Sequence, residues 1–228
     1  MVSGELWRGP GVSPVDAGSR RADAVATRRL LLRTAERLFA ERGVHAVSAR
    51  QIAEAAGQGS NSAVGYHIGT KADLVAAIVR EHVGPMDRMR EQMLRRVAGS
   101  GDLRAHIACL VLPVTNHLEG LGVPSWYARF AAQVVIDPGL RTVVVAEATA
   151  SPVMRRAMDG ILALARPMPG ECVTVRTGMV RHLIVHTCAD REQDLADGNA
   201  PSADTWPRTG RLLIDAIEAL LTIKGARL

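Results

Sequence analysis

Apolar residues recur every three or four positions along most of this 228-residue chain, and no convincing alternation of apolar and polar residues is found. The first pattern is typical of amphipathic helices and the second of strands, so the sequence predicts an all-α fold. The clearest helix is expected to begin at Thr27. Leu31, Ala35 and Phe39 fall on one of its faces, and Gly43 is placed to end it.

A second helix is predicted directly after Ser48. Ser48 and Gln51 have the spacing of a capping box, in which each side chain binds a free backbone N–H at the helix start. Gly57 supplies the positive-φ residue that ends this helix. A third, short helix is expected to begin at Ser60 or Asn61, so the segment has the order of a helix-turn-helix.

Further helices are predicted from caps, breakers and apolar stripes downstream. Thr70 with Asp73 marks the start of a connector helix that continues to Val97 and is expected to be interrupted or kinked at Pro85. A further helix is expected from Asp102, bent or broken at Pro113, and later helices are expected to start near Pro124, at Asp137-Pro138 and at Ser151-Pro152. The last two helices are expected over 171–188 and 208–224, with an acidic loop over 190–205 between them.

The first 26 residues lack apolar periodicity and are rich in glycine and proline. They are therefore expected to form a disordered arm. Arg20 and Arg21 leave open a second interpretation, in which the arm touches the DNA backbone or minor groove.

Charge is distributed unevenly along the chain. Residues 1–98 carry 15 basic and 10 acidic side chains, whereas residues 99–228 carry 13 of each. The whole excess of +5 therefore lies in the part that holds the helix-turn-helix, which favours a nucleic-acid partner there. No apolar run reaches the roughly 18 residues of a membrane span, and no signal peptide opens the chain. We therefore expect a cytoplasmic protein without a membrane partner.

Four short motifs occur in the order found in the TetR family of bacterial transcriptional regulators, which the first 80 or so residues resemble. They are Leu38–Gly43 (Leu-Phe-Ala-Glu-Arg-Gly), Ile52–Gly57 (Ile-Ala-x-x-Ala-Gly), the Tyr66-His67 pair and Gly69–Lys71 (Gly-Thr-Lys). After the arm at 1–26, the resemblance implies a three-helix DNA-binding domain (27–72) and a larger helical domain for ligand binding and dimerisation (73–228). It also implies a repressor that a small molecule releases from a double-stranded DNA operator.

The residues expected to contact DNA follow from the motif and its position. Small polar side chains at the start of the third helix suit base edges, whereas basic and hydrogen-bonding residues around them suit phosphates. The segment is one residue longer than the family's commonest form, so the register of the recognition helix stays open by one residue. The expected DNA-binding residues are Arg28, Arg50, Asn61, Ser62, Ala63, Tyr66, His67 and Lys71.

The second domain concentrates three of the seven aromatic residues of the chain in five positions. Packing in a core is one explanation, and a ligand site between helices, as in the family, is the other. On the second explanation, the ligand-binding residues are Cys109, Val114, His117, Trp126, Tyr127, Phe130 and Met154. Arg129 is expected either to bind an acidic group of the ligand or to form a surface salt bridge.

A homodimer is expected because one recognition helix reads too little DNA, and two helices related by a two-fold axis match a palindromic operator. The apolar faces of the last two predicted helices are the expected interface, through Met179, Leu183, Leu213, Ile217 and Leu220.

An enzyme is not expected. The chain has no nucleophile elbow, phosphate loop or paired set of carboxylates. His182 with His186, and His106 with Cys109, have spacings that a metal site can use, but further ligands are needed to complete either. We therefore predict no cofactor and no metal. The remaining alternative is a helical adaptor that binds only proteins, which the concentration of positive charge on the helix-turn-helix argues against.

Overall fold

The computed structural model describes residues 14–58, 68–165, 167, 170–200 and 205–223, and all regular structure in these ranges is helical. The predicted all-α fold is therefore confirmed. The helices are α1 (Pro14–Arg42), α2 (Ala49–Ala55), α4 (Lys71–Val97), α5 (Leu103–Leu121), α6 (Tyr127–Ile136), α7 (Pro138–Ala150), α8 (Pro152–Leu164), α9 (Gly170–Ala196) and α10 (Trp206–Thr222). The expected third helix lies at residues outside the described ranges.

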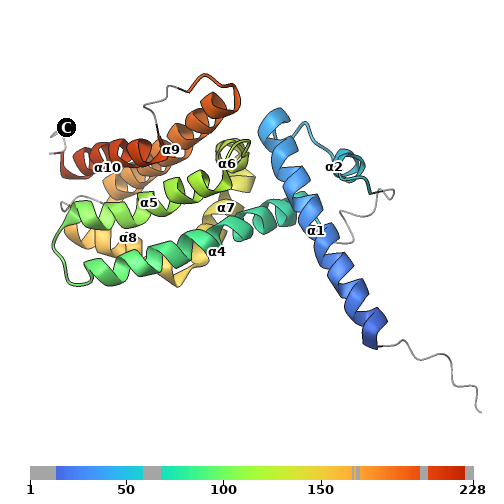
Figure 1. The fold of residues 1–228 in the computed structure, drawn as a ribbon. Coiled ribbons are helices and arrows are strands. Elements are labelled where there is room, and N and C mark those ends of the chain that lie inside the picture. Colours follow the sequence, from blue (N-terminus) through green and yellow to red (C-terminus); the bar gives the residue numbers. More distant parts are fainter. Residues whose placement is uncertain (1–13, 59–67, 166, 168–169, 201–204, 224–228) are drawn as a thin grey trace, which may run out of the picture.

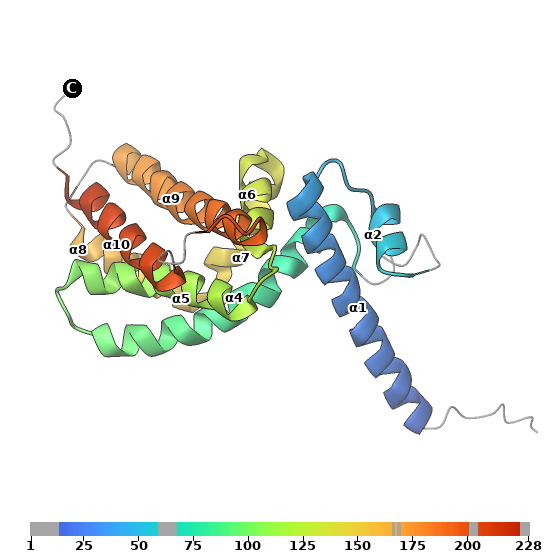
Figure 2. The ribbon, with the colours of Figure 1, turned by 45° about the horizontal axis from the view of Figure 1, so that its top comes forward.

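Two groups of helices are joined by α4 (Figure 1). Helices α5 to α10 form a bundle, and α1 crosses one end of it, with α2 on the far side of α1 from the bundle (Figures 1 and 2). Helix α4 starts beside α1 and continues along the bundle, where it packs against α5, α7 and α8. A displacement within the bundle can therefore reach the N-terminal helices through one rigid element.

Local sequence signals account for the helix starts. Ser48 and Gln51 form the predicted capping box, in which the Gln51 N–H donates to Ser48 Oγ at 3.2 Å and the Ser48 N–H donates to Gln51 Oε1 at 2.8 Å. A second capping box joins Thr70 and Asp73 at the start of α4. The predicted starts of α7 and α8 at cap-proline pairs are also confirmed.

Several predicted boundaries are wrong. Helix α1 begins at Pro14, not Thr27, because helix-favouring residues without an apolar stripe extend it. Helices α4 and α5 are not interrupted at Pro85 and Pro113, since buried residues on both sides hold each helix together despite the lost hydrogen bond; only the expectation of a break is wrong. Helix α9 continues to Ala196, through the first seven residues of the expected loop, because buried Arg191 and Glu192 anchor its last turns.

The buried apolar residues form one continuous cluster from Leu31 in α1 to Leu221 in α10. Where the two groups of helices meet, the rings of Phe39 in α1 and Phe130 in α6 are stacked with centroids 6.2 Å apart, and neither ring is exposed. The N-terminal helices therefore share a core with the bundle instead of hanging from a linker.

Candidate nucleic-acid interface and ligand cavities

The described part of the helix-turn-helix consists of α2 and the segments that hold it. Lys71, in the first turn of α4, donates from Nζ to the carbonyl of Val44 at 2.8 Å and so ties this helix to the loop after α1. Arg50 on α2 is exposed and pairs with Glu54 one turn later at 2.7 Å. Arg28 lies half-buried on α1. The other predicted DNA contacts (Asn61, Ser62, Ala63, Tyr66 and His67) lie outside the described residues.

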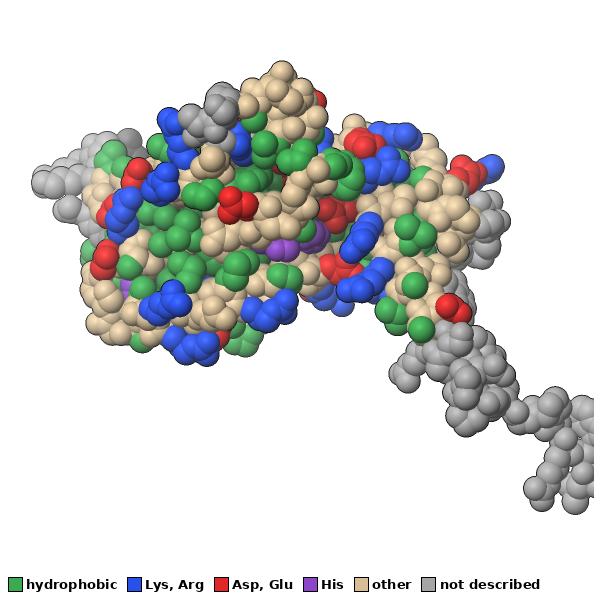
Figure 3. Space-filling view, in the orientation of Figure 1, with side chains coloured by type: hydrophobic (Ala, Val, Ile, Leu, Met, Phe, Trp, Pro, Cys, Tyr) green, Lys and Arg blue, Asp and Glu red, His purple; other side chains and the backbone are tan. Residues whose placement is uncertain are grey.

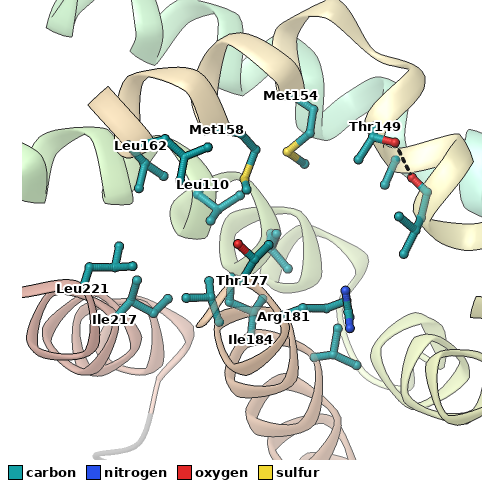
Figure 4. A pocket seen from close by; sticks show the side chains of 16 residues that line it. Leu110, Thr149, Met154, Met158, Leu162, Thr177, Arg181, Ile184, Ile217 and Leu221 are labelled. Carbon is teal, nitrogen blue, oxygen red and sulfur yellow. Dashed lines mark hydrogen bonds between the residues drawn. The ribbon is translucent and has the colours of Figure 1, made fainter. Parts of the chain in front are cut away.

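An apolar cavity of about 260 Å³ lies inside the bundle (Figure 4). Its walls come from five helices, and Met154 and Met158 of α8 face Ile184 of α9 and Ile217 of α10 across it. The complete lining is Leu110 and Val114 from α5; Val145, Ala148 and Thr149 from α7; Met154, Met158, Ile161 and Leu162 from α8; Thr177, Val180, Arg181, Ile184 and Val185 from α9; and Ile217 and Leu221 from α10.

Two features of this apolar cavity bear on what it can hold. Arg181 supplies the charged side chain in the lining, and its Nε is buried without a hydrogen-bond partner. Helix α7, which forms one wall, has no fully buried residue, so every side chain of this wall is at least partly exposed. The cavity therefore combines an apolar interior with one cation and one wall that has no fully buried residue.

A second and larger cavity, of about 730 Å³, lies where α1 meets the bundle. We call it the junction cleft. It is lined by Arg29, Arg33 and Glu36 of α1, by Arg80, Glu81, His82, Gly84, Pro85 and Arg88 of α4, by His117 and Leu121 of α5, and by Pro124, Ser125 and Trp126 before α6. Figure 3 shows histidines in a hollow at this junction, with basic side chains on its α1 side.

A chain of hydrogen bonds crosses the floor of the junction cleft. His82 Nε2 lies 3.0 Å from Glu36 Oε2, and His82 Nδ1 lies 2.8 Å from His117 Nε2. Because an ionised carboxylate only accepts, His82 donates from Nε2 to Glu36, and a neutral His82 then accepts from His117 at Nδ1. Burial, reinforced by His82, lowers the pKa of His117 to about 4. The ring of Tyr127 stacks on His82 at 3.7 Å. The network joins α1 to α4, α5 and α6.

The structure divides the predicted ligand-binding residues among three places. Val114 and Met154 line the apolar cavity, whereas His117 and Trp126 line the junction cleft. Cys109, Tyr127 and Phe130 are buried in the core and line neither cavity. The aromatic cluster therefore does not gather around one ligand site.

Arg129 forms an ion pair within the chain, to a buried glutamate that sequence reasoning missed. Glu192 of α9 is 2% exposed and accepts from Ser125 Oγ at 2.8 Å and from the backbone N–H groups of Ala128 and Arg129 at 3.3 and 3.0 Å. Its Oε2 also pairs with Arg129 Nε at 3.3 Å. Glu192 thus satisfies the free donors at the start of α6, where Trp126 provides no side-chain cap. Glu192 lies in a stretch that the sequence predicts to be a loop, so this role was not expected.

The five predicted interface residues also lie in different environments. Leu213 and Ile217 are 3% and 0% exposed and face the chain's own core, so they offer no surface to a second copy. Leu183 and Leu220 are partly buried against that core. Met179 is 47% exposed, and further exposed apolar residues are Val175 on α9, Leu212 on α10 and Ile223 directly after α10.

The described residues hold neither a metal-binding cluster nor a helix that could span a membrane. No group of three or more His, Cys, Asp or Glu side chains in the described ranges has an arrangement that could hold a metal ion. None of the described helices is long and apolar enough to cross a membrane.

The N-terminal region matches a known protein family. Residues 31–78 match the family described as bacterial regulatory proteins, tetR family. No curated relative matches the chain. Similar solved structures include the TetR family transcriptional regulator PfmR from Thermus thermophilus, at 16% identity and a TM-score of 0.47, covering 87% of this chain and 97% of that one. A candidate tetR-family regulator from Mesorhizobium loti is 12% identical with a TM-score of 0.49, over 87% and 96% of the two chains.

Proposed function

Because the chain belongs to the TetR family of DNA-binding transcriptional regulators, we propose that it is a repressor that leaves its operator when a small molecule binds. The observation that carries this proposal is the apolar cavity. Two of its walls, α7 and α8, pack on α4, and α4 begins at the helix-turn-helix. We divide the chain into a DNA-binding domain at 27–72 and a ligand-binding and dimerisation domain at 73–228. The first turns of α1, at 14–26, extend the DNA-binding domain.

The DNA contacts that we propose are those expected from the sequence. Lys71 and Arg50 suit phosphates, and Asn61 at the start of the recognition segment suits a base edge. Lys71→Ala should weaken binding to all sequences alike, whereas Asn61→Ala should relax the preference at one position by about 1–3 kcal/mol. Selection of bound fragments from random DNA should give a palindromic consensus. Equal binding to unrelated fragments at physiological salt would contradict this proposal.

The ligand that suits the apolar cavity is a small, largely apolar molecule with one acidic group. Apolar side chains from five helices supply the contact surface, and the buried Nε of Arg181 supplies a donor that an acidic group of the ligand can satisfy. Binding should draw α7 inward, since none of its residues is fully buried and contacts with a ligand would bury them further, and α4 would carry the displacement to the helix-turn-helix. Coupling of about 1–3 kcal/mol between sites corresponds to a 5-fold to 150-fold loss of operator affinity.

A matched pair of variants on α7 tests this assignment. Ala148 lines the apolar cavity, whereas Ala150, two residues later, is exposed and does not. Ala148→Phe should fill part of the cavity and abolish the response to a ligand found by thermal-shift screening, while Ala150→Phe should respond as the wild type does. The measurement is release of a labelled operator during ligand titration. If both variants release DNA alike, the effector site lies elsewhere.

The dimer surface that we propose is the outer face of α9 and α10, which lie side by side on the side of the bundle away from α4 (Figure 1). Val175, Met179 and His182 share one face of α9 at helical spacing. Leu212 is exposed on α10, and Ile223 is exposed directly after the end of this helix. The outer faces of the two helices together form an apolar surface that one copy leaves uncovered.

Two aspartate variants on α9 test the dimer. Light scattering should give about twice the 24.4 kDa of one chain for the wild type and one chain for Met179→Asp. Thr187→Asp changes an exposed residue that lies off this face and should leave the dimer intact. A wild-type monomer at micromolar concentration would refute the proposal.

A further inference from the structure

The junction cleft has an excess of positive charge that the fold does not use. Four arginines line it against two glutamates. Arg80 is paired with Glu147 at 3.3 Å, and Glu36 is engaged by His82. Among the described residues, no hydrogen bond or ion pair engages Arg29, Arg33 or Arg88, so three guanidinium groups at this cleft have no partner within the described part of the chain.

The other titratable groups at the cleft do not cancel this charge. Glu81 is exposed and is the one acid of the lining left without a partner in the described part of the chain. The lowered pKa of His117 keeps its ring neutral near pH 7. Three unpaired cations therefore face one unpaired anion, and a ligand with two negative charges would balance the difference.

Much of the remaining lining is apolar and includes a flat surface. Pro85, Leu121 and Pro124 lie beside Trp126, which is half-buried and lines the cleft. Planar groups stack on indole rings, and guanidinium groups bind phosphates and carboxylates in a bidentate manner. The volume of about 730 Å³ is within the range of small-molecule sites.

DNA is not the natural occupant of this cleft. Helix α2 lies on the far side of α1 from the bundle, whereas the cleft lies between α1 and the bundle (Figures 1 and 2). The arginines that line the cleft therefore lie on the other side of α1 from α2 (Figure 1).

We propose that the junction cleft is a second ligand site, for a small organic dianion with a flat apolar part, such as an aromatic phosphate monoester or an aromatic dicarboxylate. Its anionic end binds Arg33 of α1 and Arg88 of α4, and its flat part lies against Trp126. Such a ligand bridges the DNA-binding domain and the bundle. This site is distinct from the apolar cavity and does not depend on the effector proposed for it.

Calorimetric titration of the full chain at constant ionic strength tests the site, with phenyl phosphate and phthalate as the two dianionic probes. Inorganic phosphate lacks the ring and phenol lacks the charge, so both should bind at least tenfold more weakly than the better dianion. Whichever of phenyl phosphate and phthalate binds more tightly identifies phosphate or dicarboxylate as the preferred group. Failure of both dianions to give saturable heat up to about 10 mM, a concentration at which weak specific sites are filled, would overturn the proposal.

Paired charge variants separate this site from general attraction to a basic protein. Arg33→Gln/Arg88→Gln should weaken binding of the better probe at least tenfold. Arg42→Gln/Arg96→Gln removes the same charge from exposed positions on the same two helices outside the cleft, and should bind as the wild type does. Equal weakening in both double variants, or none in the first, would overturn the proposal. Both variants should unfold at the wild-type temperature, because the substituted side chains have no partner in the described ranges.

Discussion

Phe130→Ala should strongly destabilise the whole chain, because this ring joins the two groups of helices. Phe130 of α6 is 0% exposed and lies 6.2 Å from the ring of Phe39 in α1 and 6.3 Å from that of Tyr127. Removing a fully buried Phe ring typically costs about 3–5 kcal/mol, through lost burial and the cavity left behind. That loss is a large fraction of the roughly 5–15 kcal/mol by which most domains are stable.

Urea unfolding followed by circular dichroism measures this loss, and a control lies on the same helix. Ile136 is 61% exposed, so Ile136→Ala should change the free energy of unfolding by less than about 0.5 kcal/mol. A double-mutant cycle of Phe130→Ala with Phe39→Ala should give a coupling of about 0.5–1.5 kcal/mol, as expected for a stacked aromatic pair. A loss below about 1 kcal/mol for Phe130→Ala would refute the packing described.

This prediction changes how ligand binding should be probed. The sequence places Phe130 among candidate ligand-binding residues, and a truncated ring would then alter only the response to ligand. In the structure, the same substitution weakens the joint between the DNA-binding domain and the bundle. A lost response in Phe130→Ala would therefore not identify a binding site, which is why the α7 variants are the better test.

Three further predictions follow from buried polar groups. The pKa of His117 is lowered from 6.5 to about 4, so below pH 6.5 the unfolded chain binds a proton that the folded chain binds only near pH 4. The free energy of unfolding should therefore decrease as the pH is lowered from about 6.5 to about 4. Urea titrations at several pH values measure this dependence, and His117→Gln should reduce it. Glu192→Ala leaves the donors of Ser125 and Arg129 without their acceptor and should lower the free energy of unfolding, measured in urea, by about 3–5 kcal/mol. Gln193→Ala, at an exposed position, should lower it by less than about 1 kcal/mol. Arg181→Met should leave the melting temperature unchanged or raise it, since an unpaired buried Nε is removed; a clear drop would show that the guanidinium has a structural role.

Local signals in the sequence were sufficient for the fold class and for many helix starts. The capping boxes at Ser48 and Thr70 and the cap-proline pairs at Asp137 and Ser151 act within one turn, so residue types a few positions apart determine them. The ends of helices and the effect of prolines inside them were harder to predict, because packing against other helices determines both. Pro85 is tolerated because His82 and Met86 around it are buried against neighbouring helices, and no local pattern reveals that.

The candidate sites depended still more on tertiary structure. Trp126, Tyr127 and Phe130 are neighbours in sequence, yet Trp126 borders the junction cleft while the other two are buried in the core. Helix α6 starts one residue after Trp126, so Tyr127 and Phe130 lie on the buried side of the helix while Trp126 precedes it at the edge of the cleft. The lining of the apolar cavity comes from five helices between Leu110 and Leu221, a set that periodicity within single helices does not connect.

Helix α4 is the element that both proposed ligands would act on, and the structure predicts different effects for them. Helices α7 and α8, which form walls of the apolar cavity, pack along α4, so a ligand there displaces this helix relative to α1. An anion held between Arg33 and Arg88 instead ties α1 to α4, and adds to the bond between Glu36 and His82. A ligand shifts an equilibrium only by its difference in affinity for the two states. The anion should therefore oppose the displacement that the apolar ligand favours, and by reciprocity each ligand should weaken binding of the other.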